Sequence, residues 1–304
     1  MSATSEERYR RALISLDGLS VGDAFGAWSE MMRAQAIGRR VKDRKLPDAP
    51  WRFTDDTMMA LSIVSILRQH GRIEQDLLAA SFGARFEHGR GYGPGARAIL
   101  TRIRIGQGWR ELAPSVYEGG SYGNGSAMRV APIGAYFSDD MDAAIENARL
   151  SAEITHIHPE GIAGAIAVSV GTAIAAEKRG SLTPSRQEYI EAVLPHVPDS
   201  VVRDGIVQAQ DIPTGMTVFE VAKVLGNGSR VSSQDTVPYV LWCAGEKLDD
   251  YEEALWLTIS GGGDTDTTCA MVGGIVAAYT GREDIPEQWL QAREPLPAWP
   301  FEES

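Results

Sequence analysis

The spacing of apolar residues constrains the fold most, because it follows the period of an α-helix along almost the whole chain. Leu13, Leu16 and Leu19 lie at this spacing within residues 6–28, and Ser5 can cap that helix. The same spacing predicts helices over 58–69, 75–87, 95–105, 125–137, 140–155, 159–178, 186–194, 216–225, 236–246, 250–259 and 266–280. Alternating apolar runs bounded by turns, which are typical of strands, are scarce. The pattern therefore predicts an all-α fold.

We find no repeat, low-complexity tract or long linker in the chain, so we expect residues 1–304 to form a single domain. Hydrophobic residues make up 43% of the sequence and charged residues 23%, which is enough apolar material for a substantial core. This composition argues against a disordered chain and against a disulfide-stapled scaffold. The net charge of −12 argues against a general nucleic-acid-binding protein, because such binding needs a basic surface.

The chain is expected to be cytoplasmic and not bound to a membrane. Residues 6–11 are charged and lack the apolar region of a secretory signal. The longest uncharged stretch, 161–176, is shorter than the roughly 20 residues that span a bilayer. Cys243 and Cys269 form no C-x-x-C pattern, which favours free thiols in a reducing compartment. We take a monomer as the default state.

Glycine-rich clusters distinguish this sequence from that of an ordinary helical bundle. They lie at 90–95 (RGYGPG), 119–126 (GGSYGNGS) and 260–263 (SGGG). Glycine lets a backbone approach a ligand closely and adopt positive φ. One such cluster is explained by a turn, whereas several in one helical chain favour ligand-binding loops.

The common catalytic motifs are absent or lack the fold that they need. The chain contains no G-x-x-x-x-G-K-[ST] sequence and no complete G-x-G-x-x-G sequence, which argues against a P-loop or a dinucleotide-binding fold. Residues 119–123 (GGSYG) have the G-x-S-x-G form, but the predicted all-α fold lacks the sheet that holds this motif in serine hydrolases. The five histidines show no zinc-ligand spacing. Among the classes of catalytic group considered, carboxylate side chains remain as candidates.

Two acidic clusters, 53–57 (FTDDT) and 264–268 (DTDTT), each precede a predicted helix. Helix capping explains either cluster alone, because Thr and Asp are favoured capping residues. A cap needs one oxygen, however, and each cluster offers two carboxylates that repel one another. Mg²⁺, Mn²⁺ or Ca²⁺ takes oxygen ligands from such groups, and four carboxylates could hold two ions. The spacing leaves capping and metal binding open as alternatives.

Three further residues each have two interpretations. Asp23 lies on an otherwise apolar helix face, so we expect it to be paired by buried hydrogen bonds or placed at a site. Considered alone, Glu30 is interpreted as a surface residue, and His156 is interpreted as a histidine of the core. The basic run 33–45 is expected to be a solvated loop or, alternatively, the border of a cleft.

These residues together resemble the ADP-ribosylglycohydrolase family, which includes the dinitrogenase reductase-activating glycohydrolases. The resemblance rests on residues 22–26 (GDAFG) with Glu30, on 53–57, on 120–129 (GSYGNGSAMR), on Thr155-His156 and on 260–267 (SGGGDTDT). These motifs span most of the chain and occur in the order typical of the family, which makes the set specific.

The resemblance implies a compact orthogonal helical bundle that holds a dinuclear Mg²⁺ centre, with Mn²⁺ as the alternative metal. The metal ligands that it implies are Thr54, Asp55, Asp56, Asp264, Asp266 and Thr267. The residues that it implies at the ADP-ribose are Gly91, Gly93, Gly120, Ser121, Tyr122, Gly123, Asn124 and His156. Catalytic roles fall to Asp264, Glu30 and Asp56, with Asp264 and then Glu30 as candidates for the general base.

The activity implied is metal-dependent cleavage at the anomeric carbon of the distal ribose, which releases ADP-ribose from a modified protein or another acceptor. Backbone N–H groups of the glycine loops can bind the pyrophosphate without cationic side chains. An arginine linkage is favoured over serine, O-acetyl-ADP-ribose and nucleic-acid conjugates, the last of which the charge does not indicate. The alternatives are a catalytically silent relative that binds ADP-ribose or acts structurally, and a metal-dependent glycosidase acting on a small nucleoside or sugar.

Overall fold

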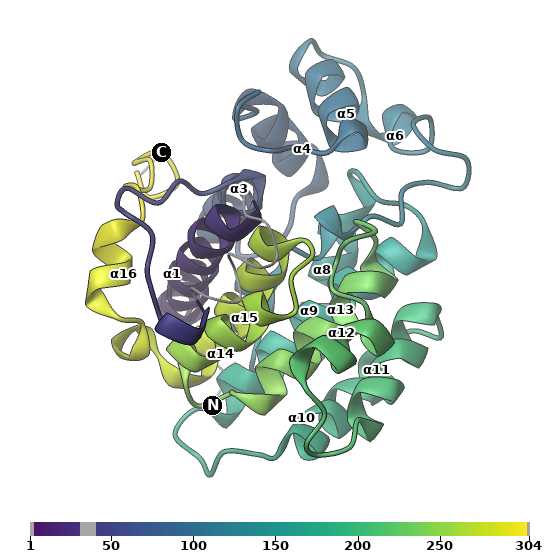
Figure 1. Ribbon diagram of the computed structural model, residues 1–304. Coiled ribbons are helices and arrows are strands. Elements are labelled where there is room, and N and C mark those ends of the chain that lie inside the picture. Colours follow the sequence, from purple (N-terminus) through teal and green to yellow (C-terminus); the bar gives the residue numbers. More distant parts are fainter. Residues whose placement is uncertain (1–2, 31–40, 303–304) are drawn as a thin grey trace.

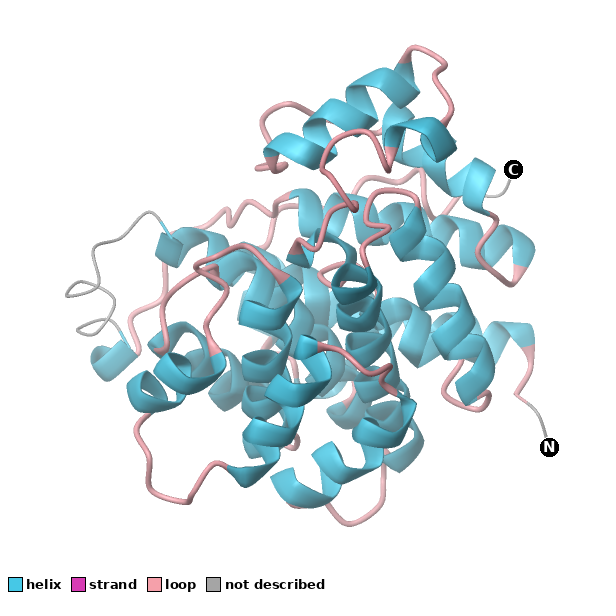
Figure 2. Ribbon diagram, turned by 90° about the vertical axis from the view of Figure 1, so that its right-hand side faces the viewer, coloured by secondary structure: helices cyan, strands magenta, loops and turns pink. Residues whose placement is uncertain are grey.

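The computed structural model describes residues 3–30 and 41–302, and its regular elements there are all helical (Figure 2). The α-helices are α1 (Ser5–Glu30), α3 (Asp55–His70), α4 (Gln75–Ala84), α5 (Pro94–Arg104), α6 (Trp109–Leu112), α7 (Ala131–Tyr136), α8 (Met141–Glu153), α9 (Pro159–Lys178), α10 (Arg186–Val193), α11 (Val201–Asp211), α12 (Val218–Leu225), α13 (Ser233–Glu246), α14 (Tyr251–Ser260), α15 (Thr265–Thr280) and α16 (Glu287–Ala292). Short 3₁₀ turns are η1 (Asn124–Ser126), η2 (Leu194–His196) and η3 (Arg282–Asp284). The predicted all-α class is confirmed.

Most predicted helices are present, with ends that differ by a few residues. The prediction of one helix over 125–137 was wrong, because that stretch contains η1, a turn and the separate helix α7. Pro132 lies in the first turn of α7, where its missing N–H is tolerated but cannot continue a preceding helix. Helix α11 was not predicted, although Val202, Ile206 and Ala209 lie buried at helical spacing.

Two central helices, α1 and α15, run antiparallel and contact each other through glycines (Figure 1). A Cβ atom added at Gly22 would lie 2.1 Å from the carbonyl oxygen of Cys269. One added at Gly26 would lie 2.1 Å from the carbonyl oxygen of Thr265. Only glycine permits this approach, which places the C-terminal half of α1 directly beside the start of α15.

Helix α9 lies against α7, α8, α13 and α15. It is long and apolar enough to cross a membrane by length and composition, but most of it is buried inside the molecule. A core helix of a globular protein has the same properties, so the burial favours that interpretation.

The segment that leads into α3 is held by the C-terminal part of the chain. Trp51 N–H donates to the carbonyl of Ala292 (2.6 Å), and Glu294 N–H donates to the carbonyl of Trp51 (2.9 Å). These bonds fix residues 51–53, so that α3 begins beside α1 and α15. Helices α4, α5 and α6 lie together at the outer end of the molecule (Figure 1).

Candidate active site

A cleft of about 960 Å³ opens where α3 and α15 begin. Its lining includes the residues expected to bind metal or ADP-ribose, namely Thr54, Asp55, Asp56, Gly91, Gly93, Gly120, Ser121, Tyr122, Gly123, Asn124, His156, Asp264, Asp266 and Thr267. The structure thus brings both acidic clusters and two of the glycine-rich loops to one place. Glu30 ends α1, but its side chain and residues 33–40 of the basic run lie outside the described residues.

The third glycine cluster does not line this cleft. A Cβ added at Gly261 would meet the Tyr239 hydroxyl at 2.2 Å, and one added at Gly263 would meet the Asn227 carbonyl oxygen at 2.1 Å. Gly263 also has a φ of +82°. These glycines let the turn between α14 and α15 pack tightly, so their role is structural.

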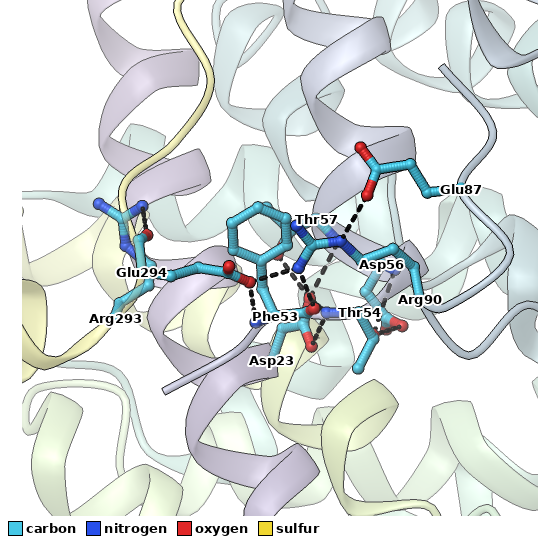
Figure 3. A network of polar contacts seen from close by, with 9 residues as sticks. All are labelled: Asp23, Phe53, Thr54, Asp56, Thr57, Glu87, Arg90, Arg293 and Glu294. Carbon is cyan, nitrogen blue, oxygen red and sulfur yellow. Dashed lines mark hydrogen bonds and ion pairs between the residues drawn. The ribbon is translucent and has the colours of Figure 1, made fainter. Parts of the chain in front are cut away.

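Asp23 fixes the start of α3. Its buried carboxylate accepts hydrogen bonds from the backbone N–H groups of Thr54 (2.9 and 3.0 Å) and Thr57 (3.0 Å), and from the Thr57 hydroxyl (2.5 Å) (Figure 3). The expectation that Asp23 is paired by buried hydrogen bonds is confirmed. Through these bonds α1 sets the position of the first acidic cluster.

An ion-pair network holds the other side of the same cluster. Arg90 donates to the carbonyl of Phe53 (2.9 Å) and to the carboxylates of Glu87 and Glu294, and it stacks over the Phe53 ring at 4.3 Å (Figure 3). Asp55 N–H in turn donates to the carbonyl of Arg90 (2.7 Å). The loop around Arg90 is therefore tied to the helix that carries the carboxylates.

Gly91 follows in this loop with a φ of +92°, a conformation that favours glycine. A Cβ atom at this position would lie 3.2 Å from Asp55 Oδ1. Glycine is therefore required both by the backbone conformation and by the close approach to the carboxylate.

Helix capping accounts for only part of the two acidic clusters. Thr54 is the cap of α3 and accepts from Asp56 N–H (3.4 Å). Asp264 occupies the cap position of α15 but makes no capping hydrogen bond with its side chain. The carboxylates of Asp55, Asp56 and Asp264 therefore need another explanation.

Three buried carboxylates lie close together, and one of them is incompletely hydrogen-bonded. One oxygen each of Asp23, Asp56 and Asp266 lies within 4.8 Å of the others. Asp56 Oδ2 accepts from the Thr54 hydroxyl (2.8 Å), whereas the buried Oδ1 has no partner among the described residues. Such an orphaned acceptor beside like charges is costly unless a proton or a cation joins it.

Burial and the neighbouring negative charges both raise the pKa values of Asp55 and Asp56. Burial, reinforced by the carboxylates of Asp23 and Asp266, raises the pKa of Asp56 well above its ordinary value. Burial and the Asp23 carboxylate also raise the pKa of Asp55 to about 8. Carboxylate and hydroxyl oxygens are the ligands that Mg²⁺, Mn²⁺ and Ca²⁺ prefer, so the donor set fits a hard divalent cation.

Asp264 is oriented by the glycine-rich loop across the cleft. The Asn124 side-chain amide donates to Asp264 Oδ2 (2.6 Å) and to the Thr236 hydroxyl (3.1 Å). Asp264 N–H donates to the carbonyl of Asn227 (3.1 Å). Asn124 therefore links the loop expected at the ADP-ribose with the second acidic cluster.

His156 forms part of the cleft wall although its side chain is buried. Its Nδ1 lies 2.7 Å from the Thr155 hydroxyl. Burial, with the Arg129 charge as a second cause, lowers the pKa of His156 to about 3. The imidazole is therefore neutral at physiological pH.

Sequence reasoning did not assign several residues of the lining to the site, among them Tyr117, Arg129 and Arg230. Tyr117 and Arg129 lie in or beside the second glycine-rich cluster, which was a signal that could have found them. Arg230 lies in a short loop before α13, and its approach to the cleft depends on tertiary packing. Asp23 was expected to be paired or placed at a site, but its position beside Asp56 and Asp266 in particular was not predicted.

Comparison with known proteins agrees with this geometry. Residues 1–300 match the model of the ADP-ribosylglycohydrolase family. The ADP-ribosylhydrolase ARH3 of Bos taurus is 29% identical over 340 residues, covering 96% of this chain and 90% of the relative. The ARH3 of Homo sapiens is 29% identical over 278 residues, covering 80% and 74%.

A solved structure described as an ADP-ribosylglycohydrolase-related protein complex superimposes with a TM-score of 0.66. The sequence identity is 25%, and the superposition covers 95% of this chain and 94% of that chain. The helical bundle therefore has the architecture that the sequence resemblance predicted. With the family match extending over nearly all of its length, the chain belongs to the ADP-ribosylglycohydrolase family.

Proposed function

We propose that this protein is a metal-dependent ADP-ribosyl hydrolase that releases ADP-ribose from a modified protein or another acceptor. The observation that carries the proposal is the cluster of buried carboxylates where α3 and α15 begin, in which Asp56 Oδ1 has no hydrogen-bond partner among the described residues. Family membership supports hydrolysis of ADP-ribosyl conjugates, and the size of the cleft suits a ligand as large as ADP-ribose.

The proposed metal site takes two Mg²⁺ ions, or Mn²⁺. The residues that would hold them are Thr54, Asp55, Asp56, Asp264, Asp266 and Thr267. When bound, such ions neutralise the carboxylates and supply a Lewis acid that orients sugar hydroxyls and activates water. The orphaned Oδ1 of Asp56 and the raised pKa values of Asp55 and Asp56 support this assignment.

The protein's own groups would position the substrate and move the proton. Asp264, held at one oxygen by Asn124, is the proposed general base, with Glu30 as the second candidate and Asp56 in a supporting role. Backbone N–H groups of the loops around Gly91 and Gly123 would bind the pyrophosphate. This arrangement lets a protein with a net charge of −12 hold an anionic ligand.

A direct test measures release of ADP-ribose from ADP-ribosyl-arginine and ADP-ribosyl-serine peptides, with Mg²⁺ and after chelation by EDTA. We expect turnover with Mg²⁺, with the arginine linkage preferred, and its loss on chelation. Asp264→Asn should reduce kcat by about 10²- to 10⁴-fold, as expected for loss of a positioned base. The matched control is Asp211→Asn, which changes an exposed aspartate outside the cleft lining and should leave turnover unchanged.

Other outcomes would favour the alternatives. Tight ADP-ribose binding without turnover of any conjugate would favour a catalytically silent relative. Failure of ADP-ribose to bind or compete would favour a glycosidase acting on a smaller nucleoside or sugar. Turnover that persists after complete chelation would contradict the metal dependence.

A further inference from the structure

Arg129 belongs to the wall of the cleft, is fully buried there and is held by uncharged acceptors. Its guanidinium donates to the carbonyls of Ser151 (2.7 Å) and Gly125 (3.2 Å) and to the Thr155 hydroxyl (3.1 Å). It also packs over the Phe82 ring at 4.7 Å. Burying a cation without a directly bonded carboxylate is costly, so these hydrogen bonds call for a role beyond filling space.

The Thr155 hydroxyl connects this arginine to His156. A hydroxyl has one proton to donate, and an arginine can only donate, so Arg129 occupies a lone pair of the Thr155 oxygen. The other group within hydrogen-bonding reach of that oxygen, among the described residues, is His156 Nδ1 at 2.7 Å. The hydroxyl proton therefore points to Nδ1, which must be unprotonated to accept it. A neutral imidazole then carries its own proton on Nε2.

Glycine residues keep the Nε2 edge of the ring uncovered. A Cβ atom added at Gly123 would lie 3.2 Å from His156 Nε2, and one added at Gly125 would lie 3.3 Å from it. Neither glycine has a φ in the left-handed region, so backbone conformation does not require glycine here. In the part of the chain that the structure describes, Nε2 has no hydrogen-bond partner, and His156 lines the cleft.

We propose that Arg129, acting through Thr155, is a positioning residue that fixes His156 as the Nε2–H tautomer and so offers the cleft a neutral hydrogen-bond donor. The ligand group would be an acceptor oxygen, such as a phosphate or hydroxyl oxygen, and this part rests on the proposed binding of ADP-ribose. The carboxylates that line the cleft supply acceptors, so a fixed donor elsewhere in the lining gives the ligand a defined orientation.

The tautomer is read directly from a long-range proton–nitrogen correlation spectrum of protein labelled with ¹⁵N-histidine, with His156→Gln used to assign the signal. We expect an unprotonated Nδ1 and a protonated Nε2 in the unliganded protein. Thr155→Val removes the hydroxyl and should shift the His156 nitrogens toward a mixture of tautomers, whereas Thr155→Ser should restore the original spectrum. A proton on Nδ1 in the wild type, or an unchanged spectrum in Thr155→Val, would overturn the proposal.

A binding measurement tests whether the Nε2–H group of His156 donates to the ligand. By calorimetry, we expect Thr155→Val to weaken ADP-ribose binding about tenfold, as for loss of one well-aligned hydrogen bond, and Thr155→Ser to bind as the wild type does. Gly125→Ala should weaken binding similarly, because its methyl group contacts the imidazole edge. Unaltered affinity in both Thr155→Val and Gly125→Ala would count against the proposal.

The tautomer spectra and the binding measurement together also separate this inference from the proposed function. If the wild type does not bind ADP-ribose at all, the proposed function fails, and the tautomer spectra still decide whether the Thr155 hydroxyl, which Arg129 contacts, fixes the tautomer of His156. Thermal unfolding of each variant shows whether it is folded.

Discussion

At the scale of single residues, the hydrogen bonds that orient each carboxylate decide what that carboxylate can do. Asp264 could in principle serve as a helix cap, but its side chain makes no capping bond and is held instead by Asn124. That amide also bonds Thr236, so its orientation is fixed on both sides. A group that orients a metal ligand or a general base contributes to activity without touching the reacting atoms.

The contact from Asn124 to Asp264 leads to a prediction. Asn124→Ala should lower Mg²⁺ affinity or turnover about 10- to 100-fold, the usual effect of removing a partner that orients a metal ligand. Thr236→Val is the matched control, because it removes the other hydrogen bond of the same amide and spares the one to Asp264. Calorimetric titration with Mg²⁺ measures both variants, and an equal loss in the two would argue that only general packing is involved.

At the scale of secondary-structure elements, the contact between α1 and α15 builds the floor of the cleft. Asp23 of α1 holds the start of α3, while Gly26 and Ser29 of α1 meet Thr265 at the start of α15. The close approach depends on glycines four residues apart on α1, which lie on one helix face. Positions of the two acidic clusters are therefore set by one helix pair.

Gly22→Ala should disturb this pair. The added methyl group would lie 2.1 Å from the carbonyl oxygen of Cys269, a backbone atom that cannot move aside alone. We expect a loss of unfolding free energy of about 3 kcal/mol or more, measured by urea denaturation. The control is Gly108→Ala, because a Cβ at Gly108 would meet nothing within 4 Å and its φ of −71° suits alanine. Equal stability of the two variants would contradict the packing argument.

At the scale of the whole molecule, the buried carboxylates make stability depend on pH and, under the proposed function, on metal binding. The pKa of Asp55 rises from 3.8 to about 8 on folding, so its charged form opposes folding. In the metal-free protein, Asp55 therefore contributes to the free energy of unfolding at low pH, where it is protonated. This contribution is lost as the pH rises from about 4 toward 8. A bound divalent cation would offset this penalty by neutralising the group.

Asp55→Asn tests this linkage. Without metal, we expect the variant to melt at a higher temperature than the wild type at pH 8, with a smaller difference at pH 5. Addition of Mg²⁺ should raise the melting temperature of the wild type at pH 8 and leave that of the variant nearly unchanged. Thermal unfolding with EDTA or Mg²⁺ at the two pH values measures this, and a wild type that Mg²⁺ fails to stabilise would count against the metal site.

Much of the fold was predictable because helix formation is encoded over short distances. Apolar spacing located α3, α9 and α15 with ends that differ by a few residues at most. The prediction of one helix over 125–137 was wrong, since apolar spacing could not show that the chain forms a 3₁₀ turn at Asn124–Ser126, where Asn124 bonds Asp264. Ordered motifs in the sequence also identified the family, which the match over residues 1–300 confirmed.

The sequence by itself therefore determined the helical class, the family and the chemical identity of the residues expected in the cleft. Only the tertiary structure decided that Asp23 joins Asp56 and Asp266, that Arg129 reaches His156 through Thr155, and that the third glycine cluster lies away from the cleft. The physical reason is distance along the chain. Ser29 and Thr265 are 236 residues apart in sequence yet share a hydrogen bond, and such contacts follow from packing rather than from local preference.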